Sequence, residues 1–180
     1  MRNHLSRNHL LIINGAILTA CAVFDYAWRT TILTGLMLIL PFVDSSFTLP
    51  QLNINAKKLI RWLICILLMY ILVTIEKDYK LVALSTLLLI ALPEEWFFRG
   101  YFMRRIEKSG LHPCHANIIT SVFFALLHLP TQGLWGLSVF IPSIIYGWIF
   151  QKYNDIVLLV FLHTLSNLIF FIYIQHRLSL

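Results

Sequence analysis

Residues 81–103 read LVALSTLLLIALPEEWFFRGYFM, and this stretch decides the fold class because its length and apolar character match one crossing of a bilayer. Two carboxylates and one guanidinium nevertheless lie inside it. A charged side chain within a bilayer costs at least about 2.5 kcal/mol, so each one is a functional hypothesis by default. The stretch therefore predicts a transmembrane helix with polar chemistry at Glu94, Glu95 and Arg99.

Helical spacing gives these three residues different surroundings. Glu95 and Arg99 are four residues apart, so they share one helix face and can pair, whereas Glu94 is rotated from them by about 100°. Glu94 is thus the freer carboxylate and the candidate general base. Pro93 lacks a backbone N–H and is expected to disturb the helix at this point. The alternative is that the charges form a purely structural ion cluster between helices.

The rest of the chain has the composition of a helical membrane protein. Its 180 residues are 59% hydrophobic and only 12% charged, whereas soluble domains contain roughly 25% charged residues. The mean hydropathy of +0.78 arises from long apolar runs separated by short charged loops. We expect an all-α, polytopic transmembrane bundle of about seven helices, within a range of about six to eight, with the active site between core helices. The expected segments are 9–24, 30–43, 59–75, 81–103, 115–129, 134–150 and 156–175.

The basic residues indicate membrane orientation rather than nucleic-acid binding. The net charge is +6, but Lys and Arg are scattered at the ends of apolar segments instead of forming one stripe. With seven spans, most of them fall on the side that holds the N-terminus, which predicts a cytoplasmic N-terminus. This side holds Arg2, Arg7, Lys57, Lys58, Arg61, Arg104, Arg105, Lys108 and Lys152, and the opposite side holds Arg29, Lys77, Lys80 and Arg177.

The cysteines predict neither a disulfide framework nor a zinc site. Cys21, Cys65 and Cys114 form no CxxC pair, and each lies in or beside apolar sequence. Residues 18–21, LTAC, resemble the cleavage box of a bacterial lipoprotein signal. A first transmembrane helix fits the same pattern and more spans follow, so we expect an uncleaved helix.

The apolar segment that ends in SVFFALLHLP, residues 121–130, contains a single imidazole. Helical spacing places Phe124 and His128 on one face, and Pro130 is expected to help end the helix. Taken alone, such a histidine is more often an interfacial or hydrogen-bonded residue than a catalyst.

The last apolar segment contains FLHTLSN, residues 161–167, in which His163 and Asn167 share a helix face. Two hydrogen-bond donors can therefore point at one spot. In a dry site they can stabilise an oxyanion, the charge that develops when water attacks a peptide carbonyl. The alternative is an interhelical hydrogen-bond pair with no chemical role.

Three motifs follow one another on these segments: Glu-Glu-x-x-x-Arg at 94–99, Phe-x-x-x-His at 124–128 and His-x-x-x-Asn at 163–167. Their order and spacing resemble the CPBP family, also called the ABI family. It includes type II CAAX prenyl endopeptidases, glutamic intramembrane proteases and bacterial proteins linked to bacteriocin immunity or sorting-signal processing. The similarity spans about residues 85–170, and short motifs become specific when they occur jointly in the expected context.

The resemblance implies a role for each motif residue. Glu94 and His128 would activate the attacking water, His163 and Asn167 would form the oxyanion hole, and Glu95 with Arg99 would support the site. The family often has a polar residue or Asn shortly after the histidine of the second motif, where this chain continues LPTQ at 129–132. That departure leaves the three motifs intact.

The resemblance also implies an activity. We expect an intramembrane endopeptidase that hydrolyses a peptide bond of a membrane-embedded or lipidated protein, in contact with the lipid bilayer and without a metal, cofactor or nucleic acid. Nothing in the sequence shows that the substrate is prenylated. A compact chain of this kind is typical of a bacterial cytoplasmic membrane. Because no internal repeat or long linker is present, we expect one integral membrane domain over 1–180, with a catalytic core at 81–175.

Two alternatives remain open on the same residues. Two histidines and a carboxylate, His128, His163 and Glu94, can surround a metal with an open water position. Metal-free catalysis is preferred by resemblance, because Asn167 is a poor zinc ligand but a good oxyanion donor. The second alternative is a non-catalytic immunity or scaffold protein that binds a peptide in the same polar cavity. A transporter is disfavoured by the small size and the lack of a repeat.

Overall fold

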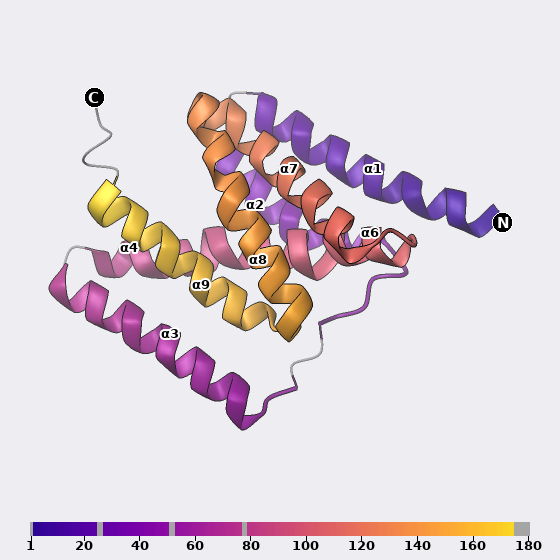
Figure 1. Ribbon diagram of the computed structural model, residues 1–180. Helices are drawn as coiled ribbons and strands as arrows, with labels where there is room; N and C mark the ends of the chain where they lie inside the picture. Colours follow the sequence, from indigo (N-terminus) through magenta and orange to yellow (C-terminus); the bar gives the residue numbers. More distant parts are fainter. Residues whose placement is uncertain (1, 25–26, 51–52, 77–78, 175–180) are drawn as a thin grey trace. The chain divides into compact units, whose positions relative to one another are not determined.

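A computed structural model describes residues 2–24, 27–50, 53–76 and 79–174, and for residues 2–8 it describes the backbone alone. Lys77, Arg177 and residue 175, the end of the seventh expected segment, lie outside this part of the chain, as do the side chains of Arg2 and Arg7. All secondary structure of the described residues is helical (Figure 1). The prediction of an all-α fold is therefore confirmed.

Four helical runs are long and apolar enough to cross a membrane, and two shorter apolar helices precede them. The long runs are Ala56–Ile75, Lys80–Lys108, Pro113–Tyr153 and Ile156–Ile174, and the shorter helices are His9–Val23 and Arg29–Val43. The described residues thus contain six apolar helices where about seven were expected. The difference arises because segments 115–129 and 134–150 follow each other without a non-helical residue between them and so count as one helical run, although the chain turns back at Gly133.

The expected break at Pro130 is wrong. Helix α7 (Pro113–Gln132) contains Pro130 and continues two residues beyond it. It ends at Gly133, whose φ of +58° is readily adopted only by glycine. The tighter helix η5 (Gly133–Val139) then leads directly into α8 (Phe140–Tyr153).

The chain forms two compact units, Met1–Leu49 with Trp96–Asn154, and Pro50–Glu95 with Asp155–Leu180. The first unit contains α1 (Arg2–Val23), α2 (Arg29–Ile39), η1 (Leu40–Val43), η4 (Trp96–Met103), α6 (Arg104–Lys108), α7, η5 and α8. The second contains α3 (Ala56–Ile75), α4 (Lys80–Ser85), η3 (Thr86–Ala91), α5 (Leu92–Glu95), α9 (Ile156–Ile169) and η6 (Phe170–Ile174).

In the first unit, α7 and α8 form a closely packed antiparallel pair (Figure 1). Asn117 of α7 donates a hydrogen bond from Nδ2 to the backbone oxygen of Ile144 at 2.9 Å. A Cβ atom added at Gly147 would overlap Oδ1 of Asn117. Glycine is therefore required where α8 approaches this amide, as is common where membrane helices pack tightly.

Aromatic rings fill the space between η4 and α7. The Phe98 and Phe124 rings meet edge to face with centroids 4.9 Å apart, and those of Phe102 and Phe123 stack at 5.0 Å. Such pairs add roughly 0.5–1.5 kcal/mol beyond their buried area. They fix η4, and with it Arg99, against the helix that carries His128.

A buried polar network joins other parts of the first unit. Asp44 accepts hydrogen bonds from the Arg105 Nε at 2.8 Å, the Ser46 hydroxyl at 2.6 Å and the Ser46 backbone N–H at 2.9 Å. The Tyr101 hydroxyl donates to Oδ2 of Asp44, the oxygen that also accepts from Arg105, at 3.4 Å, and it accepts from Nδ2 of Asn14 at 3.0 Å. The network ties α1, the turn after η1 and the η4–α6 stretch together.

In the second unit, α9 packs against α3, η3 and α5. Asp155 caps the N-terminus of α9 by accepting from the Leu158 backbone N–H at 3.1 Å. Both carboxylate oxygens also lie 3.1 Å from Nε1 of Trp62 on α3, and Arg61 Nη2 lies 3.7 Å from Oδ2. The capping residue thus fixes the position of α9 along α3.

Helical backbone is continuous from Lys80 to Lys108, but it is not a regular α-helix. The segments η3 and η4 are π-helical and lie on either side of the short α5, which contains Pro93. At the end of η3 the Leu92 N–H bonds to the oxygen of Leu87, five residues back. The disturbance expected at Pro93 takes the form of widened turns, which occur frequently at functional sites.

Candidate active site

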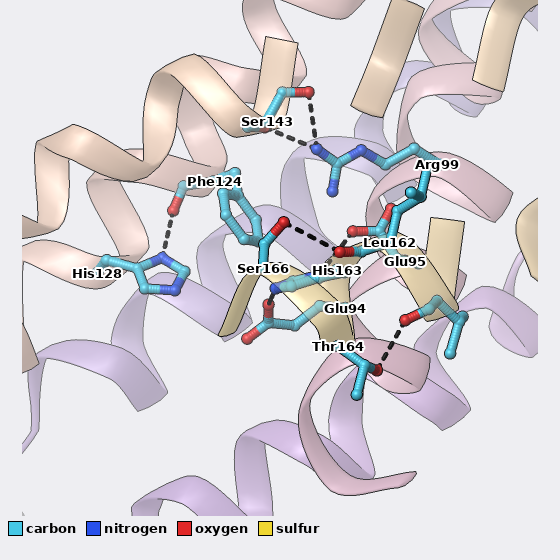
Figure 2. A network of polar contacts seen from close by, with 11 residues as sticks. Glu94, Glu95, Arg99, Phe124, His128, Ser143, Leu162, His163, Thr164 and Ser166 are labelled. Atoms are coloured by element: carbon cyan, nitrogen blue, oxygen red, sulfur yellow. Dashed lines mark hydrogen bonds and ion pairs between the residues drawn. The ribbon is translucent and has the colours of Figure 1, made fainter. Parts of the chain in front are cut away.

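The imidazole of His163 lies between two adjacent carboxylates of α5 in the second unit (Figure 2). Nδ1 of His163 is 2.8 Å from Oε1 of Glu95, and Nε2 is 3.6 Å from Oε2 of Glu94. An ionised carboxylate only accepts hydrogen bonds, so the N–H at Nδ1 donates to Glu95. The distance to Glu94 exceeds that of a direct hydrogen bond.

The two carboxylates differ in exposure as well as in contact. The side chain of Glu95 is 0% exposed, whereas that of Glu94 is 15% exposed. The Oε2 atom of Glu94 makes no hydrogen bond to any described residue. Glu95 thus holds the imidazole, and Glu94 faces it with a side chain that is partly exposed.

The local sequence explains why these groups meet. Residues 94 and 95 differ by about 100° around a helix, so both can face a partner that sits between their directions. Helix α9 packs against α5, and its N-terminus is fixed by Asp155. His163, two turns into α9, is thereby placed at the level of the two carboxylates.

Asn167 lies one turn beyond His163 on the regular part of α9, as the spacing predicted. Its side chain is partly exposed, and its amide makes no hydrogen bond within the residues that the structure describes. The neighbouring hydroxyls of Thr164 and Ser166 bond instead to carbonyls of their own helix, at Val160 and Leu162. The Asn167 amide is therefore a hydrogen-bond donor that no described residue uses.

Arg99 belongs to the first unit and is fully buried. Its Nη2 donates to Oγ of Ser143 at 2.8 Å and to the Ser143 backbone oxygen at 2.9 Å (Figure 2). The guanidinium carbon also lies 5.2 Å from the centre of the Phe124 ring. The expected ion pair between Glu95 and Arg99 stays a prediction.

His128 also lies in the first unit, near the C-terminal end of α7. Its Nδ1 is 2.8 Å from the backbone oxygen of Phe124, one turn earlier, and the Phe124 and His128 rings are 4.6 Å apart (Figure 2). A carbonyl oxygen accepts only, so Nδ1 carries a proton and Nε2 is the nitrogen available to another group.

The structure therefore brings Glu94, Glu95 and His163 together in one unit, and Arg99, Phe124 and His128 in the other. Sequence reasoning missed two contacts. The hydrogen bond from His163 to Glu95 spans 68 residues, and no spacing rule predicts it. Ser143 carried no motif, although a serine in an apolar helix next to a motif arginine is a polar residue that needs an explanation. Among the described residues, no group of three His, Cys, Asp or Glu side chains is arranged to hold a metal ion.

Apolar helices of membrane-spanning length that bury a carboxylate, an imidazole and a guanidinium, at Glu95, His163 and Arg99, define a helical integral membrane protein. The chain matches the family model of the type II CAAX prenyl endopeptidase Rce1-like proteins over residues 76–169, more than half of its length, and it belongs to that family. It is thus a CAAX protease-like membrane endopeptidase. No curated protein and no solved structure matches the chain.

Proposed function

We propose that the chain is a glutamic-type intramembrane endopeptidase, in which Glu94 and His128 activate water to hydrolyse a peptide bond of a membrane-embedded or lipidated protein. The observation that carries the proposal is the position of His163, hydrogen-bonded to the buried Glu95 and facing Glu94. A carboxylate that faces a partly accessible space beside an oriented imidazole has the composition of a hydrolytic site.

The reaction has two steps. The water oxygen attacks the carbonyl carbon while Glu94 accepts a water proton, and the carbonyl oxygen becomes an oxyanion. The tetrahedral intermediate then collapses, the C–N bond breaks, and the proton held by Glu94 passes to the leaving amine. His128 orients the attacking water through Nε2, because Nδ1 is occupied by the Phe124 carbonyl.

His163 and Asn167 stabilise the oxyanion in this proposal. For His163 to donate to it, Nε2 must carry a proton while Nδ1 donates to Glu95. Because Nδ1 donates to Glu95, the imidazole is held with Nε2 on the side of Glu94, so Glu95 supports the oxyanion hole by orienting its donor. This gives Glu95 a role in addition to the predicted pairing with Arg99.

The decisive experiment measures cleavage by the detergent-purified protein of three quenched fluorescent peptides. One ends in a farnesylated Cys-aliphatic-aliphatic-X sequence, the second is the same peptide without the lipid, and the third is an apolar transmembrane peptide. Glu94→Gln and His128→Ala should each lower kcat by about 10²- to 10⁴-fold on the peptide that is cleaved. Ser85→Ala, on the exposed face of α4, is the control and should cleave normally.

The same assay separates the alternatives. Cleavage that persists in both variants excludes the proposed roles of Glu94 and His128. If no peptide is cleaved but the wild type and both variants bind one equally, the chain is a binding or immunity protein. Activity that is lost on exhaustive chelation and restored by one specific metal ion would establish a metal-dependent reaction instead.

We also propose that the protein lies in a bacterial cytoplasmic membrane with its N-terminus in the cytoplasm. The excess of Lys and Arg on the N-terminal side of the expected topology supports this orientation. Reporters fused to the N-terminus and to the loop after Lys108 test this orientation. At both positions a reporter that is active only in the cytoplasm should be active, and one that is active only in the periplasm should be inactive.

A further inference from the structure

The buried serine of α8 is bonded to the motif arginine and has no place in the three motifs. Ser143 and Arg99 are both 0% exposed, and one guanidinium nitrogen contacts both the hydroxyl oxygen and the backbone oxygen of Ser143. Hydrogen bonds to a charged group are about twice as strong as neutral ones. A guanidinium with two such bonds at one residue is held in a defined orientation.

The oriented guanidinium of Arg99 lies against the ring of Phe124, the first residue of the second motif. Its central carbon is 5.2 Å from the Phe124 ring and 5.8 Å from the ring of Tyr146, one turn after Ser143 on α8. Both distances are within the range of a cation–π contact. Arg99 is therefore positioned by one residue pair of α8 and in turn contacts Phe124.

Phe124 passes this constraint to the imidazole of His128. The two rings are 4.6 Å apart, and the backbone oxygen of Phe124 accepts the hydrogen bond from Nδ1 of His128 at 2.8 Å. The hydrogen bond fixes which nitrogen carries the proton, and the ring contact limits rotation of the imidazole. The direction of Nε2 thus depends on where the Phe124 ring lies.

We propose that Ser143 is a positioning residue for the reaction: by holding Arg99 against Phe124, it fixes the orientation of the His128 imidazole. This inference rests on the proposed role of His128 as a water-activating residue. It assigns to α8, which carries no motif, the task of aligning the second motif. It also gives the phenylalanine of that motif a role, since its ring contacts both the guanidinium and the imidazole.

The test is a double-mutant cycle on kcat with the peptide that the wild type cleaves. Ser143→Ala should lower kcat about tenfold with KM nearly unchanged, because the hydroxyl that helps orient Arg99 is lost. Phe124→Leu, which removes the flat ring, should lower kcat at least as much. If Ser143 acts through Phe124, the double variant should be no slower than Phe124→Leu, whereas independent structural effects would multiply.

Ser121→Ala is the matched control. Ser121 is also 0% exposed and lies in the same unit, and its hydroxyl donates to Asn117 at 3.2 Å instead of bonding to Arg99. It should lower the unfolding midpoint to a similar extent as Ser143→Ala and leave kcat unchanged. Ser143→Cys keeps the side-chain volume with a weaker hydrogen-bonding atom, and it takes the place of Ser143→Ala if that variant does not fold.

A normal kcat in folded Ser143→Ala or Ser143→Cys overturns the inference, as does a multiplicative double-mutant effect. These results are distinguishable from failure of the proposed function, because Glu94→Gln is assayed in parallel. If Glu94→Gln is inactive and Ser143→Ala is fully active, the hydrolase proposal stands and the positioning role of Ser143 is rejected.

Discussion

Glu95 accepts a hydrogen bond from Nδ1 of His163 at 2.8 Å, although 68 residues separate the two in the sequence. The carboxylate is 0% exposed and the imidazole 8% exposed, so the pair lies almost wholly out of contact with solvent. Breaking a buried pair by removing one partner is far more destabilising than never forming it. The pair therefore couples the fold of the second unit to the orientation of a proposed catalytic side chain.

Glu95→Gln separates the charge of Glu95 from its shape. The amide oxygen of glutamine can still accept the hydrogen bond from Nδ1, but the bond is no longer made to a charged group and orients the imidazole less strongly. We expect kcat to fall by about 10- to 100-fold, less than for loss of the whole oxyanion donor. Steady-state kinetics of the purified variant, with its melting temperature as the folding control, measure this. A wild-type rate would show that His163 works without the charge of Glu95.

Asn167→Ala distinguishes an oxyanion donor from an interhelical hydrogen bond. The amide is partly exposed and has no partner within the described residues, so its removal should hardly change thermal stability. If it stabilises the oxyanion, kcat should fall by about 10²- to 10³-fold with little change in KM. Ser166→Ala, which removes an exposed hydroxyl bonded to its own helix, is the matched control. Lost stability with normal kcat would favour the interhelical alternative.

Asp155→Ala should destabilise the second unit by more than an ordinary cap substitution. An N-cap change to alanine costs about 0.5–2 kcal/mol, and Asp155 also accepts from Trp62. Asn55→Ala, at the exposed N-cap of α3, removes a single cap bond and is the comparison. Chemical unfolding in detergent should show a larger loss for Asp155→Ala, and Trp62→Phe should recover part of the difference in a double-mutant cycle.

Acid should weaken the first unit through Asp44. Burial raises the pKa of this carboxyl, but hydrogen bonds from Ser46 and Arg105 outweigh it and hold the pKa below its ordinary value of 3.8. A carboxyl with a lowered native pKa stabilises the fold fully above the unfolded value, and this stabilisation is lost as the pH falls through the native value. The melting temperature should therefore decline below pH 3.8.

Asp44→Asn provides the control for this pH dependence. The variant lacks the ionisable group, so it should be less stable than the wild type at neutral pH and should show a shallower decline in acid. Parallel declines for the two proteins would contradict the assignment and place the acid sensitivity elsewhere in the chain.

Gly147→Ala tests the close approach of α7 and α8. The added methyl group would overlap Oδ1 of Asn117, whose amide is already bonded to the Ile144 carbonyl. Overpacking of this kind costs roughly 1–3 kcal/mol. Gly35→Ala is the matched control, since nothing lies within 4 Å of a Cβ added there, and alanine is the better helix former. Equal melting temperatures for the two variants would show that the helix pair can separate without loss.

The parts of the fold that follow from local rules were predictable from the sequence. The apolar runs became helices, and the spacing of His163 and Asn167 gave their relative position because α9 is a regular α-helix at that point. The helix count was less reliable. Pro130 lies inside α7 instead of ending it, and the helix ends at Gly133, a glycine of the kind that commonly ends helices but that was not used to place this boundary.

The meeting of residues distant in sequence was not predictable in the same way. His163 was expected to form the oxyanion hole with Asn167 or, in the alternative, to surround a metal with Glu94 and His128. Its hydrogen bond to Glu95 was not expected, because it depends on how α9 packs against α5. Packing of two apolar helices is determined by many side chains at once, and a single sequence does not reveal it. Ser143 was missed for the same reason, since its importance comes from Arg99 and not from its own neighbours in the chain.

The π-helical backbone beside Pro93 makes the site sensitive to the length of the chain and not only to its composition. A widened turn contains one residue more than the α-helical turn it replaces. Deleting a single residue from Thr86–Ala91 would therefore turn both carboxylates of α5 by about 100° relative to Lys80. The alignment of Glu94 and Glu95 with His163 therefore depends on the number of residues in this stretch. Substitution of one apolar residue by another is expected to be tolerated there far better than insertion or deletion of a residue.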